Sequence, residues 1–147
     1  MILDQSLPEG SDALPVAESS PVLRILVVED GKNAADILAM FFELEGHQAS
    51  VAYDGAQAVH LAESLRPHLI LMDIGMPRMN GLEAARRIRS TAGGSDPVIV
   101  ALSGKDQEED KRQCREAGID AHLAKPVAPD ELRALIERYR DRFAGLA

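Results

Sequence analysis

The chain of 147 residues contains few aromatic side chains, a single cysteine and no long hydrophobic run. Aromatic residues make up 3% of it, so its core must be mainly aliphatic. Cys114 has no partner for an internal disulfide, and nothing indicates an oxidising compartment. No apolar run approaches the roughly 18 residues of a membrane span, and the N-terminus lacks the features of a signal peptide. These absences predict a cytoplasmic protein that does not contact a membrane.

Basic residues are also scarce, with 16 Lys and Arg against 24 Asp and Glu and a formal net charge of −8. A nucleic-acid-binding domain needs a basic face, so we expect no nucleic-acid partner. Residues 1–22 contain no Lys or Arg, and they contain four acids: Asp4, Glu9, Asp12 and Glu18. They also contain three prolines and show no periodicity. We therefore expect a disordered acidic leader or linker over 1–22 and one domain over 23–147.

From residue 22 onward, short apolar runs alternate with helical patterns. The apolar runs predict five strands, at 22–28, 48–52, 68–72, 97–102 and 121–124. Between them, apolar residues recur at helical spacing. Five βα units with apolar strands favour a parallel sheet covered by helices on both faces, because right-handed crossovers produce an open, doubly wound α/β sandwich.

The predicted helices have recognisable apolar positions and ends. The first has Ala34, Ile37, Leu38, Phe41 and Leu44 at three- and four-residue spacing, and the third has Leu82, Ala85 and Ile88. Asp54 with Gln57, and Asp106 with Glu109, predict capping boxes for the second and fourth helices. The last helix is expected to begin near Pro129 and to continue through Phe143.

Residues suited to chemistry stand at the ends of four predicted strands. They are Glu29, Asp30, Asp73, Ser103 and Lys125. In a doubly wound sheet the carboxyl ends of the strands form the ligand site. Three clustered carboxylates raise each other's pKa unless a cation joins them, and Mg²⁺ suits such oxygen ligands. We expect Asp30 and Asp73 as direct ligands, Glu29 as a ligand through water, and the Gly75 carbonyl as the third protein contact.

A carboxylate beside such an ion can attack phosphorus and form an aspartyl phosphate. Phosphoryl transfer needs in-line positioning and neutralisation of the equatorial oxygens. The Lys125 ammonium and the Ser103 hydroxyl are suited to contact two of those oxygens. The residues therefore predict Asp73 as a phosphoryl acceptor, with Lys125 and Ser103 as its catalytic partners.

Four segments together resemble the receiver domains of two-component response regulators. They are ILVVED (25–30), LILMDIGMPRMNG (69–81), VIVALSG (98–104) and AGIDAHLAKP (117–126), and the resemblance covers about residues 23–143. It implies a flavodoxin-like (βα)5 fold with strand order 2-1-3-4-5. It also implies Mg²⁺-dependent phosphorylation of Asp73 by a histidine kinase or a histidine phosphotransfer protein, in a signalling domain that is not a metabolic enzyme. Signalling would continue to a downstream protein target.

The resemblance further implies a conformational switch in the face formed by the fourth helix, the fifth strand and the fifth helix. Its switch residues are Ser103 and the residue three before Lys125, which is His122 where the family usually has Tyr or Phe. We expect activation to depend on pH between about 6 and 7, near the ordinary histidine pKa. The family also often has a cis bond at the position of Lys125–Pro126. His47, His60 and His68 show no metal-binding spacing and are expected at the surface or at strand edges.

Two other functions remain open at this point. One is a pseudo-receiver, a protein-interaction module that works without phosphorylation. The other is a small phosphatase of the haloacid dehalogenase type, which would need an Asp where this chain has Gly75. The chain is either free-standing or the C-terminal receiver of a hybrid histidine kinase. Kinase choice is expected to depend on surface residues of the first helix, such as Lys32, Asn33, Ala35 and Asp36.

Overall fold

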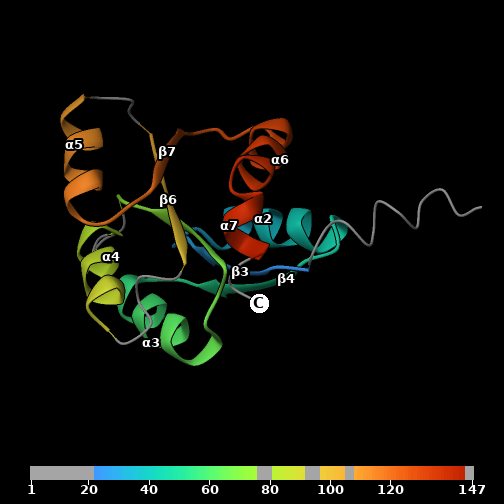
Figure 1. Ribbon diagram of the computed structural model, residues 1–147, viewed down its shortest axis with the longest axis horizontal. Coiled ribbons are helices and arrows are strands. Elements are labelled where there is room, and N and C mark those ends of the chain that lie inside the picture. Colours follow the sequence, from blue (N-terminus) through green and yellow to red (C-terminus); the bar gives the residue numbers. More distant parts are fainter. Residues whose placement is uncertain (1–21, 76–80, 92–96, 105–107, 145–147) are drawn as a thin grey trace, which may run out of the picture.

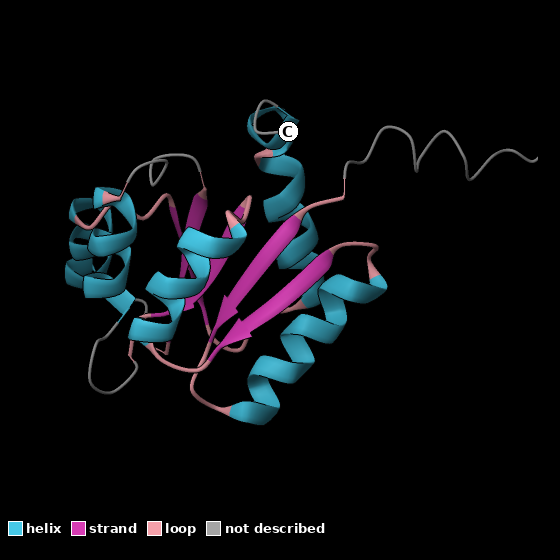
Figure 2. Ribbon diagram, turned by 90° about the horizontal axis from the view of Figure 1, so that it is seen from below, coloured by secondary structure: helices cyan, strands magenta, loops and turns pink. Residues whose placement is uncertain are grey.

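The computed structural model describes residues 22–75, 81–91, 97–104 and 108–144, and these form a five-stranded parallel sheet (Figures 1 and 2). Its strands are β3 (Arg24–Val28), β4 (Gln48–Ala52), β5 (Leu69–Asp73), β6 (Val98–Ser103) and β7 (Ala121–Ala124). Their order across the sheet is β4-β3-β5-β6-β7. Numbered along the chain this is 2-1-3-4-5, so the predicted fold is confirmed.

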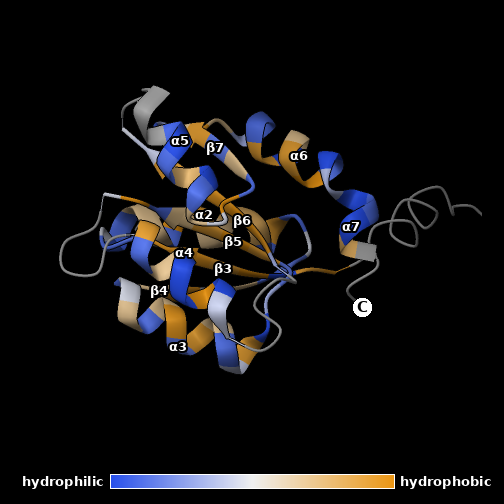
Figure 3. Ribbon diagram, turned by 60° about the vertical axis from the view of Figure 1, so that its left-hand side comes forward, coloured by the Kyte–Doolittle hydropathy of each residue, from blue (hydrophilic) through white to orange (hydrophobic). Residues whose placement is uncertain are grey.

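Helices cover both faces of the sheet (Figure 1). On one face lie α2 (Lys32–Leu44), α6 (Pro129–Arg138) and α7 (Arg140–Ala144), which share a core with Ile25 and Val27 of β3. On the other lie α3 (Gly55–Leu65), α4 (Gly81–Ser90) and α5 (Glu108–Glu116), whose core includes Leu26 and Val28. Because both faces are covered, the central strands are apolar throughout, as their colouring in Figure 3 shows.

Local side-chain contacts fix where α3 begins. Asp54 is its N-cap, and its Oδ1 accepts a hydrogen bond of 2.7 Å from the Gln57 amide. The Gln57 side chain accepts in return from the Tyr53 amide. The predicted capping interaction is therefore confirmed, except that the amide donor is Tyr53 and not the N-cap residue Asp54. The corresponding prediction for Asp106 and Glu109 lies outside the described residues. No described helix has the length and apolar character that a membrane span needs.

Two helix predictions were wrong in detail. In α2 the buried residues are Ala35 and Phe42, with Leu38 half-buried, whereas Ala34, Ile37 and Leu44 are exposed. The helix has two apolar stripes one residue out of phase, and the sequence pattern alone did not show which one faces the sheet. Ala35 is 0% exposed, so it cannot be a surface residue that a kinase reads. The last helix is also divided, because Tyr139 separates α6 from α7.

Candidate functional site

The sheet brings the predicted site residues to one edge. Glu29 and Asp30 directly follow β3, while Asp73 ends β5 and Ser103 ends β6. Lys125 follows β7, and its amide donates to the Ser103 carbonyl at 2.8 Å. Since neighbouring parallel strands end together here, residues from distant parts of the sequence surround one point.

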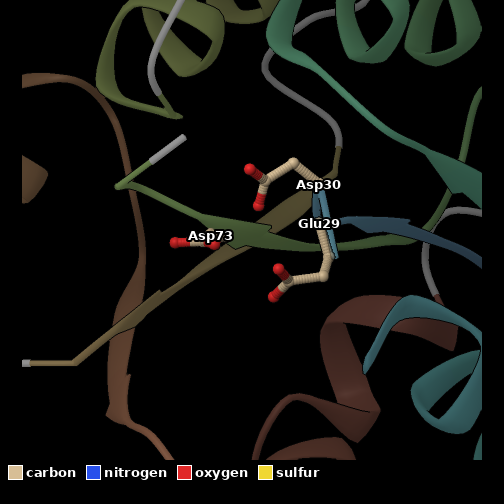
Figure 4. Close-up of side chains that lie close together, drawn as sticks. All are labelled: Glu29, Asp30 and Asp73. Atoms are coloured by element: carbon tan, nitrogen blue, oxygen red, sulfur yellow. The ribbon is translucent and has the colours of Figure 1, made fainter. Parts of the chain in front are cut away.

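Three carboxylates form the centre of this site (Figure 4). One oxygen from each of Glu29, Asp30 and Asp73 lies within 4.8 Å of the others. Glu29 and Asp73 are buried, at 5% and 7% exposure, whereas Asp30 is exposed. Two buried negative charges at such short range are unfavourable without a cation.

Lys125 supplies one positive charge between the two buried acids. Its Nζ lies 3.0 Å from Asp73 Oδ2 and 3.2 Å from Glu29 Oε1. Burial lowers the pKa of Lys125, but its hydrogen bonds and attraction to the two carboxylates outweigh burial and raise the pKa above 10.5. The ammonium is therefore charged at neutral pH.

Lys125 does not fully compensate the negative charge of Glu29, because the pKa of Glu29 is still raised. Burial raises the pKa of Glu29 above 4.5, and the Asp73 charge raises it further, while the Gly31 amide and Lys125 act in the opposite direction. A raised carboxyl pKa means that the folded protein resists the negative charge. A divalent cation at this cluster would offset that cost, so the donor set fits Mg²⁺, which prefers carboxylate oxygens.

Backbone amides orient the two buried carboxylates. The Gly31 amide donates to Glu29 Oε2 at 3.1 Å, and the Gly75 amide donates to Asp73 Oδ1 at 2.9 Å. These contacts leave each carboxylate with one oxygen on an amide and one on Lys125. Contact between the Gly75 carbonyl and a metal ion stays a prediction.

Gly81 lets the chain pass close behind Asp73. A Cβ at this position would lie 2.7 Å from the Asp73 carbonyl oxygen and 2.7 Å from the Ile74 Cα. Both are backbone atoms that cannot move aside without shifting the end of β5, so only glycine fits. The glycine that closes the LILMDIGMPRMNG segment is thus needed to place Asp73 at the end of β5.

The two predicted switch residues lie on adjacent strands. Ser103 is buried at 6% exposure and is paired with Ala124 in the β6–β7 register. His122 pairs with Ala101, is half-buried, and has its Nε2 shielded from solvent. The Lys125–Pro126 bond is cis, as the resemblance implied. Movement of Ser103 and His122 stays a prediction.

Comparison with known proteins places the chain in a family. The model of the response regulator receiver domain matches residues 25–137, so the chain belongs to the receiver-domain family of two-component signalling. Response regulator MprA of Mycobacterium bovis is 37% identical over 127 residues, which cover 84% of this chain and 54% of that protein. The MprA of Mycolicibacterium vanbaalenii is 38% identical over 79% of this chain and 51% of its own length. The chain thus spans about half the length of these curated relatives.

Solved structures agree with this assignment. The receiver domain of the sensor histidine kinase PA1611 from Pseudomonas aeruginosa has 33% identity and a TM-score of 0.74, covering 81% of this chain and 98% of that one. That domain was solved with magnesium coordinated in its active-site cleft. Chemotaxis protein CheY4 of Vibrio cholerae, at 24% identity and a TM-score of 0.77, covers 80% of this chain and 98% of its own and shares the fold.

Proposed function

We propose that this receiver accepts a phosphoryl group on Asp73 from a phosphohistidine protein. The observation that carries the proposal is the contact between the buried Asp73 carboxylate and the Lys125 ammonium, at 3.0 Å, within a cluster of three acids. A carboxylate oxygen of Asp73 would form the new bond to phosphorus as the phosphorus–nitrogen bond to the donor imidazole breaks. The imidazole leaves with the electron pair of that bond and takes a proton, so the product is an acyl phosphate.

The chain's own residues divide this work among themselves. The Gly75 amide donates to one Asp73 oxygen, and the Lys125 ammonium contacts the other. As negative charge develops on the phosphoryl group, the ammonium would move its contact from Asp73 to a phosphoryl oxygen. Ser103 would contact a second oxygen from the end of β6. Glu29, Asp30, Asp73 and the Gly75 carbonyl would hold Mg²⁺, which supplies charge neutralisation for the phosphoryl group. We therefore propose a self-phosphorylating and self-dephosphorylating signalling domain rather than a metabolic enzyme.

Output is proposed to pass through the face formed by α5, β7 and α6. Phosphorylation adds about two negative charges at the carboxyl edge. Ser103 and His122 would transmit this change from β6 and β7 toward α5, whose described core residues are few, chiefly Cys114. We also propose residues 23–147 as the receiver unit and 1–22 as a linker, a boundary that limited proteolysis near Pro21 would test.

A small phosphodonor tests the phosphoryl-acceptor proposal directly. With acetyl phosphate and Mg²⁺ present, intact-protein mass spectrometry is expected to show one added phosphoryl group that alkali removes. EDTA and Asp30→Asn should each strongly reduce the adduct, because they remove the ion or one of its ligands. Asp73→Asn should abolish it. An adduct of equal yield in Asp73→Asn would refute Asp73 as the acceptor, and no adduct on the wild type would favour the pseudo-receiver.

The exposed stripe of α2 is proposed to receive the phosphohistidine protein. Ile37, Met40 and Leu44 lie one or two turns apart on this helix and are 66%, 56% and 80% exposed. Exposed apolar residues grouped on one helix face are typical of protein-binding sites. The helix begins two residues after Asp30, so a partner bound along it would reach the acidic edge.

Substitution in this stripe should separate the two kinds of donor. Met40→Ser is expected to slow transfer from a phosphorylated histidine phosphotransfer protein by about tenfold, the loss of one moderate interface contact. Acetyl phosphate should phosphorylate the variant at the wild-type rate, because it needs no docking surface. His60→Ser on the exposed side of α3 is the matched control. Equal slowing with both donors would contradict a docking role.

A further inference from the structure

Two histidines lie at the edge of the sheet opposite the acidic site. His47 directly precedes β4 and His68 directly precedes β5, the two neighbours of β3. They were expected at the surface or at strand edges, and they do stand at strand starts. However, His68 is buried, at 6% exposure, and His47 is half-buried, whereas His60 is exposed. Neither His47 nor His68 takes part in the proposed phosphoryl chemistry.

Both rings accept hydrogen bonds from consecutive backbone amides. Leu23 N–H donates to His47 Nδ1 at 3.1 Å, and Arg24 N–H donates to His68 Nδ1 at 2.9 Å. Successive amides of a strand point to opposite sides, so one ring bonds on the β4 side of β3 and the other on its β5 side. At the start of the sheet, each imidazole therefore accepts the amide hydrogen bond that a backbone carbonyl of the neighbouring strand would otherwise accept.

Backbone hydrogen bonds complete both rungs. The Gln48 amide donates to the Leu23 carbonyl at 2.9 Å, and the His68 amide donates to the Arg24 carbonyl at 2.8 Å. The two histidines therefore hold the chain where the described structure begins, directly after residues 1–21. We propose that His47 and His68 form a pH-sensitive latch that fastens the start of β3 to both neighbouring strands and loosens in mildly acidic solution.

The chemistry of imidazole makes the latch depend on protonation. A ring whose Nδ1 accepts must be neutral and carry its proton on Nε2. Adding a second proton turns Nδ1 into a donor, which then faces the donor amide of β3. Each latch bond is therefore lost when its ring becomes charged.

The surroundings of His68 oppose its protonation. Burial lowers the pKa of His68 below 6.5, and the positive charge of Arg24 lowers it further. The Arg24 guanidinium donates to the Arg66 carbonyl at the end of α3. Arg89 of α4 and Arg142 of α7 also reach this edge, where both donate to the Pro97 carbonyl, but both are ion-paired with the Asp120 carboxylate. The next residue, Val98, donates its amide to the backbone carbonyl of His68 and not to the ring.

At His47 burial opposes protonation, whereas the neighbouring charge favours it. Burial lowers the pKa of His47, and the smaller opposing effect of the Glu45 charge at the end of α2 leaves the pKa below 6.5. Glu45 is itself paired with Arg133 of α6 at 3.2 Å, which reduces its effect on the ring. In both rings the folded-state pKa lies below the unfolded value. The stability contributed by the latch is thus fully present above pH 6.5 and is lost as the pH falls through the folded-state values.

Nuclear magnetic resonance of the full chain tests the latch. At neutral pH, ring nitrogen shifts should show the Nε2–H tautomer for both histidines, and both should titrate below 6.5. From about pH 7.5 to about pH 5, exchange protection of the Leu23 and Arg24 amides, corrected for intrinsic rates, should fall by up to about tenfold, the effect of one hydrogen bond. An Nδ1–H tautomer, a midpoint at or above 6.5, or pH-independent protection would overturn the proposal.

Asparagine substitutions distinguish the effect of protonating the two rings from the effect of their hydrogen bonds to β3. The side-chain oxygen of Asn can take the place of Nδ1 as an acceptor, and it does not titrate. The double variant His47→Asn, His68→Asn should keep Leu23 and Arg24 protected at both ends of the pH range, while the control His60→Asn should lose protection as the wild type does. The same acid-induced loss in the double variant would contradict the latch. If the double variant does not fold, the tautomers and midpoints of the wild type still decide the question.

Discussion

Replacing Lys125 with methionine is expected to slow phosphorylation of Asp73 by acetyl phosphate by about a hundred- to a thousandfold, the usual cost of removing one preorganised charge-stabilising donor. The ammonium lies 3.0 Å from Asp73 and 3.2 Å from Glu29, so it is held by the acids before any phosphoryl group arrives. Methionine keeps most of the length and apolar surface of the side chain. The rate loss should therefore report the missing charge, and mass spectrometry over time measures it.

Magnesium binding separates this effect from loss of the fold. Lys125→Met should still bind Mg²⁺, because the variant keeps all three carboxylates and loses a competing cation. Its stability without metal should fall, since the two buried carboxylates of Glu29 and Asp73 both lose their ion pair with Lys125. Lys111→Met on α5 is the matched control and should phosphorylate normally. A rate for Lys125→Met within threefold of the wild type would contradict the proposed role of the ammonium.

The sheet, and the set of residues that meet at its carboxyl edge, could be predicted from the sequence because both depend on simple patterns. The central strands are buried on both faces, so they read as short aliphatic runs, and the helices between them force a parallel sheet. The predicted site residues follow those runs directly. Once the strands are parallel, Glu29, Asp73 and Lys125 must meet at one edge, although Asp73 and Lys125 are 52 residues apart.

Contacts that depend on three-dimensional fit could not be read from the same patterns. Helix α2 is apolar on two stripes, and only its packing on the sheet shows that Phe42 is buried and Leu44 exposed. The amides that orient Glu29 and Asp73 belong to Gly31 and Gly75. In the sequence, the only indication of these contacts is a glycine two residues after each acid. The ring contacts of His47 and His68 had no signal at all, because a histidine before a strand is equally compatible with an exposed position.

The largest effect on stability is expected at Asp120, which sequence analysis did not identify. Its Oδ2 accepts from Arg89 at 2.8 Å and from the Ile99 amide at 2.9 Å, and its Oδ1 accepts from Arg142 at 3.2 Å. One carboxylate thus joins α4, β6 and α7 at the start of β7. Its partners are 21 to 31 residues distant in sequence, so no local pattern indicates the network.

Asp120→Ala is expected to lower the free energy of unfolding by about 2 kcal/mol, less than for a fully buried ion pair because the Asp120 side chain is 23% exposed. It leaves the Ile99 amide without its acceptor and two guanidiniums without their shared anion. For a chain of this length, the melting temperature should fall by roughly 4–8 °C, which differential scanning calorimetry measures.

Two further variants and an activity measurement show whether this loss comes from the network. Asp120→Asn keeps an acceptor for the Ile99 amide and should recover part of the stability. Glu137→Ala removes the exposed pair between Glu137 and Arg140, and should leave the melting temperature nearly unchanged. Below their melting temperatures all three variants should phosphorylate Asp73 at the wild-type rate, because Asp120 lies at the amino end of β7 and Asp73 at the carboxyl end of β5. If Asp120→Ala melted with the wild type, the carboxylate would not be joining these elements, and the burial of their apolar faces alone would have to hold α4 and α7 in place.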